Sequence, residues 1–380
     1  MFQTYKRAPL VLVRGDGCRV WDENGKEYLD FVGGIAVCAL GHSSPVISTA
    51  ICEQSKQLVH VSNLYYTQPQ TELAQILVEN SFADRVFFSN SGAEANEAAI
   101  KLARQYSRNH YGPNRHVILT MENSFHGRTM ATLSATGQEK TRKGFDPVLE
   151  GFRYVPFNNL PGLEAAVDGS VCAVMLEPIQ GEGGIVMPDS GYLKGVRQIC
   201  DAHNLLLILD EIQVGMGRTG NLFAYQHFGI TPDIITLAKA LGNGLPIGAM
   251  MAREELNDSL GAGTHATTFG GSPLITSGAL ALVKSLLHDG WIEHAREMGT
   301  YFKERLVELQ GKYSFVQEVR GVGLILGLLL ERGGNEIVDA CAEKGFLINC
   351  VQERVLRFVP PLIVCENEID LLVNCLDEAL

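Results

Sequence analysis

The sequence predicts an α/β fold, with a large domain built on a mostly parallel sheet and a smaller α+β domain. Short apolar runs alternate with amphipathic segments, as expected for βα units around a buried sheet. The apolar runs are rich in Val, Ile, Leu or Phe, and each leads into a polar or glycine-rich turn. The chain has 380 residues, and domains usually contain about 100–200, so we expect two domains.

Buried strands are predicted at 86–88, 116–121, 171–176, 205–209 and 234–237, where each run is short and apolar. Helices are predicted between the strands, and the clearest are 93–106, with small and apolar side chains on one face, and 193–203. Ligands of an open parallel sheet bind beyond the carboxyl ends of its strands. We therefore expect functional residues in the polar turns that follow the strands.

The second domain is predicted from a change in the chain after Pro273, where glycine-rich turns become rare. Helical stretches at 274–287 and 292–310 then precede strand-like segments at 322–330 and 355–359. Residues 46–272 are thus predicted to form the large domain and residues 273–380 the small domain. Residues 1–45, with a strand-like run at 18–21 before the turn at 23–25, are expected to pack with the small domain.

Composition excludes several classes of function. The net charge is −12 and no run of Lys or Arg offers a stripe for a phosphate backbone, which disfavours nucleic acid as a partner. Nine scattered cysteines, none in a CxxC pair, favour neither a metal site nor disulfides. No segment reaches the ~18 apolar residues of a membrane span, and the N-terminus lacks the apolar core of a signal peptide, so we expect a cytoplasmic protein.

The first candidate site is the stretch 89–95, directly after a predicted strand and directly before a predicted helix. Gly92 lets the backbone approach a ligand closely. The free N–H groups of Ser91, Gly92 and Ala93 at a helix N-terminus, reinforced by the helix dipole, suit a phosphate. The alternative is an ordinary helix start capped by Ser91.

The second candidate is Asp210, at the end of the apolar run 205–209. An acid at the end of a buried strand is costly unless a cation meets it, and a protonated heteroaromatic nitrogen is one such cation. Gln213, on the same turn, could form a hydrogen bond with a phenolic oxygen of such a ring. The alternative is an aspartate that caps the next helix or binds a metal.

The third candidate is Lys239, immediately after the apolar run 234–237 and before several glycines. A partly desolvated lysine amine has a lowered pKa and becomes nucleophilic toward an aldehyde, so Lys239 can form a Schiff base. The alternative is a lysine whose amine extends into solvent.

Together, a phosphate cup, an acid for a ring nitrogen and a Schiff-base lysine indicate pyridoxal 5'-phosphate (PLP) as the cofactor. The segment 125–128, which follows another predicted strand, adds two suitable side chains. Phe125 can stack on a pyridine ring, and Arg128 suits a carboxylate. The alternative for these two is a core phenylalanine and a surface arginine.

These residues occur within motifs that resemble the class III aminotransferases, which have PLP fold type I, like aspartate aminotransferase. The resemblance covers nearly the whole chain and is closest to the branch that acts on N-acetylornithine. It rests on Leu29 to Phe31, Gly34 to Val37, Ser62 to Tyr66, Ser91 to Asn96, Phe125 to Arg128, Glu177 to Glu182, Asp210 to Gln213, Lys239, Thr268 to Gly271 and Arg357 to Pro361.

The resemblance implies a role for each cofactor residue. Gly92 and Ala93 would hold the phosphate, Phe125 and Ile212 would stack on the ring, and Gln213 would contact the ring oxygen. Thr268 would reach the phosphate bound by a neighbouring subunit, so the resemblance also implies a homodimer with shared active sites.

The resemblance also implies how substrates bind. Arg128, beside Thr267, would hold the α-carboxylate. Glu182 would mask Arg357 while the amine donor is bound and would move aside for 2-oxoglutarate. The alternative for this pair is an exposed salt bridge, worth under ~1 kcal/mol.

The predicted activity is transfer of the ω-amino group of N2-acetyl-L-ornithine to 2-oxoglutarate, giving N-acetyl-glutamate 5-semialdehyde and L-glutamate, in arginine biosynthesis. Lys239 would act as anchor and as acid/base. Ile35 favours an acylated donor, because ornithine aminotransferases have a tyrosine there. Other donors remain open: succinylornithine, acylated diaminopimelate, 4-aminobutyrate or ornithine. A PLP-binding protein without turnover is the alternative of another class, against which intact Lys239, Asp210 and Arg128 argue.

Overall fold

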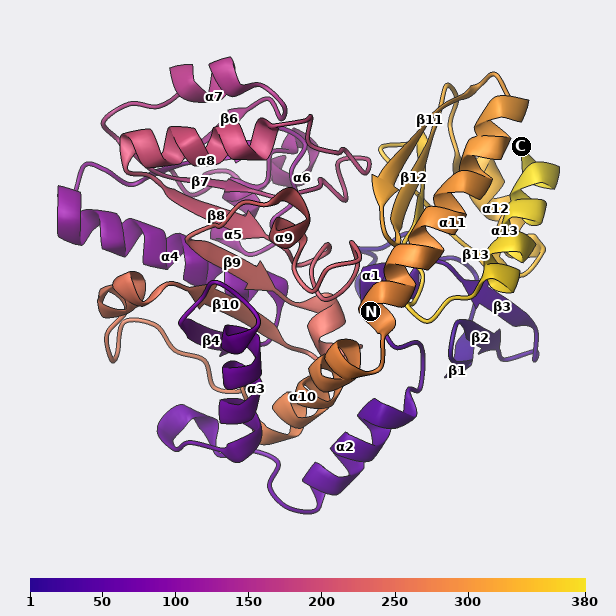
Figure 1. The fold of residues 1–380 in the computed structure, drawn as a ribbon, viewed down its shortest axis with the longest axis horizontal. Helices are drawn as coiled ribbons and strands as arrows, with labels where there is room; N and C mark the ends of the chain where they lie inside the picture. Colours follow the sequence, from indigo (N-terminus) through magenta and orange to yellow (C-terminus); the bar gives the residue numbers. More distant parts are fainter.

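The computed structural model describes residues 1–380 and contains a central seven-stranded sheet (Figure 1). The strand order is β4 (Arg85–Ser89), β10 (Gly248–Ala252), β9 (Ile234–Leu237), β8 (Leu206–Asp210), β7 (Val171–Leu176), β5 (Val117–Met121) and β6 (Phe152–Val155). All neighbours are parallel except β10, which is antiparallel to β4 and β9. The mostly parallel sheet and its five predicted strands are thus confirmed.

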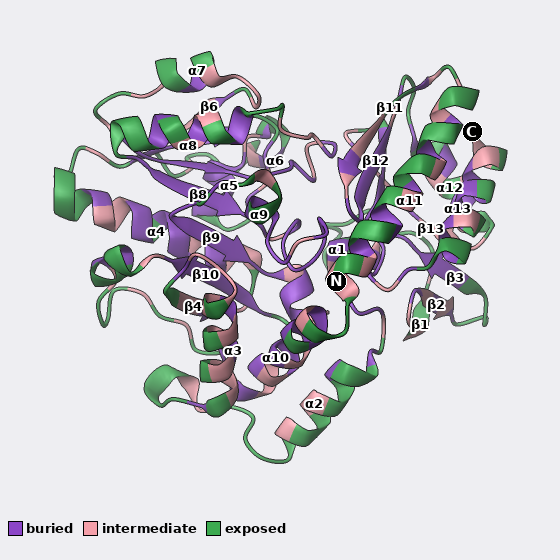
Figure 2. Cartoon of the chain, in the orientation of Figure 1, coloured by how far each residue is buried: buried purple, intermediate pink, exposed green.

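Helices cover both faces of this sheet, because alternate residues of its strands belong to two separate cores. Leu206 and Ile208 of β8 pack in one core with α4 (Gly92–Tyr111). Leu207 and Leu209 pack in the other core with α8 (Tyr192–His203). Both predicted helices are confirmed within a few residues. Figure 2 shows these strands as buried and the helices as exposed only on their outer sides.

Shorter helices complete the crossovers between the strands. They are α5 (Met130–Ala135), α6 (Glu139–Arg142), α7 (Leu160–Ala165), α9 (Ala224–Phe228), η2 (Lys239–Gly242) and η3 (Glu254–Ser259).

A second, antiparallel sheet has the strand order β11 (Val316–Val322), β12 (Ile325–Leu330), β15 (Val355–Phe358) and β14 (Asn349–Val351). It lies with α11 (Trp291–Lys312), α12 (Asn335–Glu343) and α13 (Glu366–Ala379) to one side of the central sheet (Figure 1). The single strand predicted at 322–330 is wrong at its start. Gly323, with φ +55°, forms a turn there, and β11 and β12 make a hairpin.

The N-terminal strands form a third sheet, in the order β1 (Leu12–Asp16), β2 (Arg19–Asp22), β3 (Glu27–Asp30) and β13 (Phe346–Leu347). Strand β13 pairs in parallel with β3, so this sheet joins the N-terminal segment to a strand from the C-terminal part of the chain. The short helix α1 (Gly33–Ala36) leads from this sheet toward the centre of the molecule (Figure 1).

Three helices pack together below the central sheet in the view of Figure 1: α2 (Pro45–Ser55), α3 (Gln68–Glu79) and α10 (Pro273–His288). The short helix η1 (Ser62–Leu64) lies between α2 and α3 in the sequence. Helix α10 contacts α2 and α3, although the predicted boundary at 273 assigns it to the small domain. The domain boundaries stay a prediction. No helix has both the length and the apolar character required to cross a membrane.

Candidate active site

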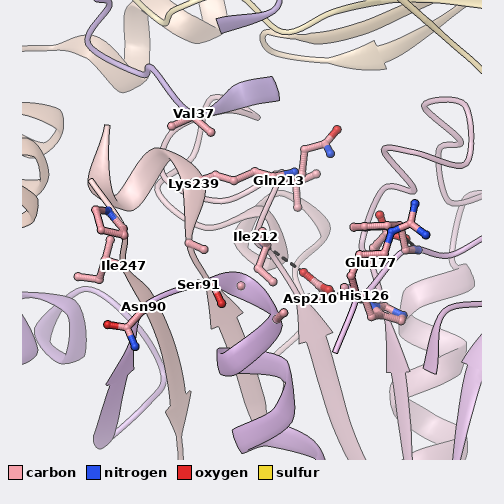
Figure 3. A pocket seen from close by; sticks show the side chains of 18 of the residues that line it. Val37, Asn90, Ser91, His126, Glu177, Asp210, Ile212, Gln213, Lys239 and Ile247 are labelled. Atoms are coloured by element: carbon pink, nitrogen blue, oxygen red, sulfur yellow. Dashed lines mark hydrogen bonds and ion pairs between the residues drawn. The ribbon is translucent and has the colours of Figure 1, made fainter. Parts of the chain in front are cut away.

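A cavity of about 440 Å³ opens at the carboxyl ends of the central strands. Segments far apart in the sequence line it, and Figure 3 shows how their side chains converge. Nine of the predicted site residues line the cavity: Ser91, Gly92, Ala93, Phe125, Arg128, Asp210, Ile212, Gln213 and Lys239.

Lys239 lies directly after β9 and extends across the cavity toward Gln213 (Figure 3). Its backbone has φ +42°, an uncommon conformation for a residue other than glycine. Such strain persists only where the surroundings enforce it, which is typical of functional positions.

The amine of Lys239 is poised for nucleophilic chemistry. Burial, with Arg357 as a second cause, lowers the pKa of Lys239 to about 8, although Glu182 and Asp210 act in the opposite direction. The neutral form of an amine is the nucleophile, so a lowered pKa increases the reactive fraction near neutral pH. Lys239 therefore has the environment that the Schiff-base hypothesis requires.

This environment predicts that Lys239 reacts selectively with amine reagents when the cofactor has been removed. At pH 8 about half of its amine should be neutral, because the pKa is about 8. Labelling by trinitrobenzenesulfonate, followed by peptide mass spectrometry, should be faster at Lys239 than at the exposed Lys284 and should rise between pH 7 and 9. Bound cofactor should protect Lys239 alone, and equal rates at both lysines would contradict the prediction.

Asp210 ends β8 and is held by a network of hydrogen bonds. Its Oδ2 accepts from Asn96 Nδ2 and from His126 Nδ1, both at 2.8 Å, and its Oδ1 accepts from Ile212 N at 3.1 Å. Asn96 is fixed in turn because its Oδ1 accepts from Thr236 Oγ1 at 2.7 Å. A carboxylate that is only 4% exposed requires such partners. The network fixes an anionic side chain at the wall of the cavity.

The N-terminus of α4 forms another wall. Ser91 is its N-cap and accepts a hydrogen bond from Glu94 N at 3.2 Å, while the N–H groups of Gly92 and Ala93 have no partner in the protein. A Cβ at Gly92 would lie 2.7 Å from Ile212 Cδ1, so only glycine lets Ile212 pack here. Two free amides at the start of a 20-residue helix form a ready site for phosphate.

Glu177, at the end of β7, shapes a third wall. Its carboxylate accepts from Phe125 N at 3.0 Å and from Gly181 N at 3.1 Å, so it ties two loops together. Burial raises the pKa of Glu177 to about 7, and nearby His126 opposes the rise. The loop that it holds presents Phe125 to the cavity, with the guanidinium of Arg128 5.4 Å from the Phe125 ring centre. Arg128 is exposed and has no acidic partner.

Glu182 and Arg357 form an ion pair 2.6 Å apart next to the cavity. Burial would raise the pKa of Glu182, but the attraction of Arg357 outweighs it and lowers that pKa. Arg357 also donates to Gln213 Oε1 at 3.2 Å and to Asn349 Oδ1 at 3.2 Å. Its side chain is 1% exposed and that of Glu182 30%, so the carboxylate is the partner with room to move.

The other predicted residues do not line the cavity. Thr267 lies behind Asn90, whose Nδ2 donates to Thr267 Oγ1 at 3.1 Å. Thr268 is exposed to solvent, and Ile35 is 41% exposed with φ +67°. Their roles, and those of all the predicted site residues, stay predictions.

The sequence interpretation gave no role to four residues that build the site: Asn90, Asn96, His126 and Glu177. His126 and Asn96 both occur in quoted motifs, but the residues that they contact are 84 and 114 positions away. The sequence did contain one signal for Asn96. It is a polar residue on the buried, mostly apolar face of α4, which indicates a polar partner inside the protein.

Comparison with known proteins gives a consistent result. The family model described as "Aminotransferase class-III" matches residues 2–380. The acetylornithine aminotransferase of Caldanaerobacter subterraneus is 53% identical, with 100% of this chain and 97% of that protein covered. That of Methanocaldococcus jannaschii is 52% identical, with coverages of 99% and 94%.

Two solved structures are also similar. The N-acetylornithine aminotransferase of Stenotrophomonas maltophilia has a TM-score of 0.86 and 40% identity, over 99% of this chain and 96% of that one. The ornithine aminotransferase of Toxoplasma gondii has a TM-score of 0.96 and 35% identity, over 100% of this chain and 91% of that one. Both structures cover the N-terminal sheet as well as the central one.

Proposed function

The chain belongs to the class III aminotransferases, and we propose that it transfers the ω-amino group of N2-acetyl-L-ornithine to 2-oxoglutarate. The enzyme class, a PLP-dependent transaminase, follows from the family. The products would be N-acetyl-glutamate 5-semialdehyde and L-glutamate, and the step would serve arginine biosynthesis. The names of the relatives that are 52–53% identical support this donor.

The residues around the cavity fit PLP. The free amides of Gly92 and Ala93 would hold its phosphate, and the fixed carboxylate of Asp210 would meet its ring nitrogen. Ile212 and Phe125 offer apolar surfaces for the two faces of the ring. When bound, PLP supplies an aldehyde for covalent attachment of an amine and a ring that stabilises negative charge on the attached carbon.

Lys239 would move protons at the reacting carbon. Its amine lies in the cavity, and its lowered pKa, about 8, lets it accept and return a proton near neutral pH. Asp210 would keep the ring nitrogen protonated, because a buried carboxylate stabilises a neighbouring cation. The walls formed by Phe125 and Ile212 would limit water at this position.

The observation that carries the choice of substrates is the contrast between two arginines. Arg128 is unpaired at the cavity, whereas Arg357 is masked by Glu182. N-acetylornithine has one carboxylate and 2-oxoglutarate has two. Arg128 would hold the carboxylate at one end of either molecule, and Arg357 would serve the second carboxylate only after Glu182 moves.

The choice among donors is tested by single half-reactions with N-acetylornithine, succinylornithine, an acylated diaminopimelate, 4-aminobutyrate and ornithine. We expect N-acetylornithine to convert the absorbance of the bound cofactor fastest. Ile35→Tyr should shift the preference toward ornithine, because it adds a phenol beside the free α-amino group of that donor. A faster half-reaction with another donor would replace the proposed substrate, and no change with any donor would favour a binding protein without turnover.

Removing Glu182 should impair discrimination between donor and acceptor. In Glu182→Ala, Arg357 stays unmasked, so 2-oxoglutarate should compete in the half-reaction of the donor, and the apparent KM for N-acetylornithine should rise about tenfold at a fixed 2-oxoglutarate concentration. The half-reaction of 2-oxoglutarate itself should keep its rate. Glu318→Ala, which removes an exposed ion pair with Arg320, is the matched control. Unchanged constants for both half-reactions would refute the switch.

We also propose a homodimer in which Thr268 completes the site of its partner. Thr268 is exposed beside Phe269, which is 64% exposed, and the segment with Leu64, Tyr65 and Tyr66 is exposed as well. Such an apolar surface favours association. Mixed dimers of Lys239→Ala and Thr268→Ala subunits test whether the subunits share their active sites. If they do, one of the two sites keeps both residues and stays active; if they do not, each site lacks one residue and both lose activity.

The nine cysteines, all free, support a reducing compartment such as the cytoplasm.

A further inference from the structure

Four cationic side chains line a second cavity, of about 390 Å³, that lies apart from the active site. Lys101, Arg104 and Arg108 belong to α4, from its middle toward its C-terminus, and Arg115 follows in the loop before β5. We call this cavity the basic pocket, and its other lining residues are Gln105, Pro113, His116, Leu260 and Thr264. The N-terminus of α4 lines the active-site cavity, so one helix connects the two (Figure 1).

The cations of the basic pocket have no acidic partner within ion-pair distance, although the charge of Glu97 acts on Arg104. No acidic residue lines it, and none of its four cations takes part in an ion pair. This is notable in a chain with 43 acidic and 31 basic residues, where carboxylates outnumber cations. Like charges that face one cavity repel one another, and a bound anion would relieve that repulsion.

Neutral groups hold two of the guanidinium groups in place. Arg115 donates from Nε to Val171 O at 2.7 Å and from Nη2 to His203 O at 2.7 Å, and its guanidinium lies 4.1 Å from the Tyr111 ring centre. Carbonyl oxygens and an aromatic ring orient a cation without cancelling its charge. The protein therefore presents Arg115 in a fixed position with its full charge.

Arg104 is held in a similar way. Its Nη2 donates to Glu150 O at 2.8 Å, and its guanidinium lies 4.9 Å from the Phe152 ring centre. Its Nε is buried without a hydrogen-bond partner, which is unusual for a charged donor. Lys101 donates to Thr264 O at 2.9 Å, while Arg108 is exposed and its side chain has no hydrogen bond. Arg108 thus has all its donors free for a ligand.

We propose that the basic pocket binds a small anion that carries phosphate groups. Several arginines that converge on a concave site match phosphate oxygens, which accept paired hydrogen bonds from guanidinium groups. The cavity has the size of a small-molecule site, and Pro113 and Leu260 give it apolar walls. This site is independent of the proposed transamination, because none of its residues lines the active-site cavity.

The test is isothermal titration of the PLP-loaded enzyme with inorganic pyrophosphate. The loaded form is used because its phosphate cup is filled. We expect one binding event per chain, with an affinity that falls as salt is raised, since salt screens exposed charges. Absence of binding at millimolar pyrophosphate and low salt would overturn the proposal.

Variants of Arg108 test whether pyrophosphate binds at the basic pocket. Arg108→Glu should weaken pyrophosphate binding about tenfold or more, because a cation becomes an anion facing the ligand. Arg108→Lys should retain part of the affinity. Arg332→Glu, at an exposed position outside the pocket, makes the same charge change and should leave binding intact. Equal weakening in Arg108→Glu and Arg332→Glu would show a general charge effect and refute the site.

Discussion

Replacing Lys239 by alanine should lower kcat by about 10⁴-fold or more, the largest loss that we expect from any single substitution. The substitution removes both the amine that attaches the cofactor and the base that moves the proton. Lys239 is also the one lysine that lines the cavity, so no second amine can replace it. The cofactor should still bind through the amides of Gly92 and Ala93, without the covalent bond.

Three measurements check this prediction. Borohydride reduction of the loaded enzyme should fix the cofactor to the Lys239 peptide in the wild type and to no peptide in Lys239→Ala. Lys284→Ala, at an exposed position in an ion pair with Glu72, is the matched control and should keep full activity. Thermal unfolding should show that the Lys239 variant is folded. A reducible adduct at another lysine would contradict the assignment of Lys239 as the residue that attaches the cofactor.

The sequence was sufficient for five of the seven strands of the central sheet, because local pattern and buried position agree there. The residues of β7 and β8 are all buried, and their apolar runs could only be core strands. The antiparallel strand β10 was not foreseen, since its sequence, Gly248 to Ala252, has no β-branched residue. Antiparallel pairing with β4 on one side and β9 on the other holds β10 in the sheet, and the pattern of neighbouring residues in the sequence gives no sign of such pairing.

The candidate site shows the same division between local and distant information. Lys239, Asp210 and Gly92 each stand at the junction of a strand and a turn or helix, so their positions could be predicted from neighbouring residues. The partners of Asp210 could not, because Asn96 and His126 reach it from α4 and from the loop after β5. Thr268 lies outside the cavity of its own chain, and only an assembled dimer could give it a role there.

Asp210→Asn should lower kcat by about 10²–10³-fold, the second largest effect that we expect. The amide is similar in size but neutral, so it would no longer hold a proton on the ring nitrogen of the cofactor. The substitution also disturbs the network, because Asn96 Nδ2 donates to Asp210 Oδ2 and His126 Nδ1 lies 2.8 Å from the same oxygen. An asparagine offers only one acceptor oxygen, and its NH₂ group would face other donors or leave them unpaired.

The charge effect and the network effect can be separated by pairing Asp210→Asn with His126→Asn. His126→Asn keeps the Asp210 carboxylate but removes one of its partners, so it should cost much less activity if the charge is what matters. The absorbance of the bound cofactor followed against pH gives a second readout. Asp210→Asn should lower the pH at which the ring nitrogen loses its proton, because the stabilising anion is gone. Asp168→Asn, at an exposed ion pair with Arg153, should leave both readouts unchanged. Equal losses in Asp210→Asn and His126→Asn, with no shift in the titration, would show that Asp210 acts only by positioning its neighbours.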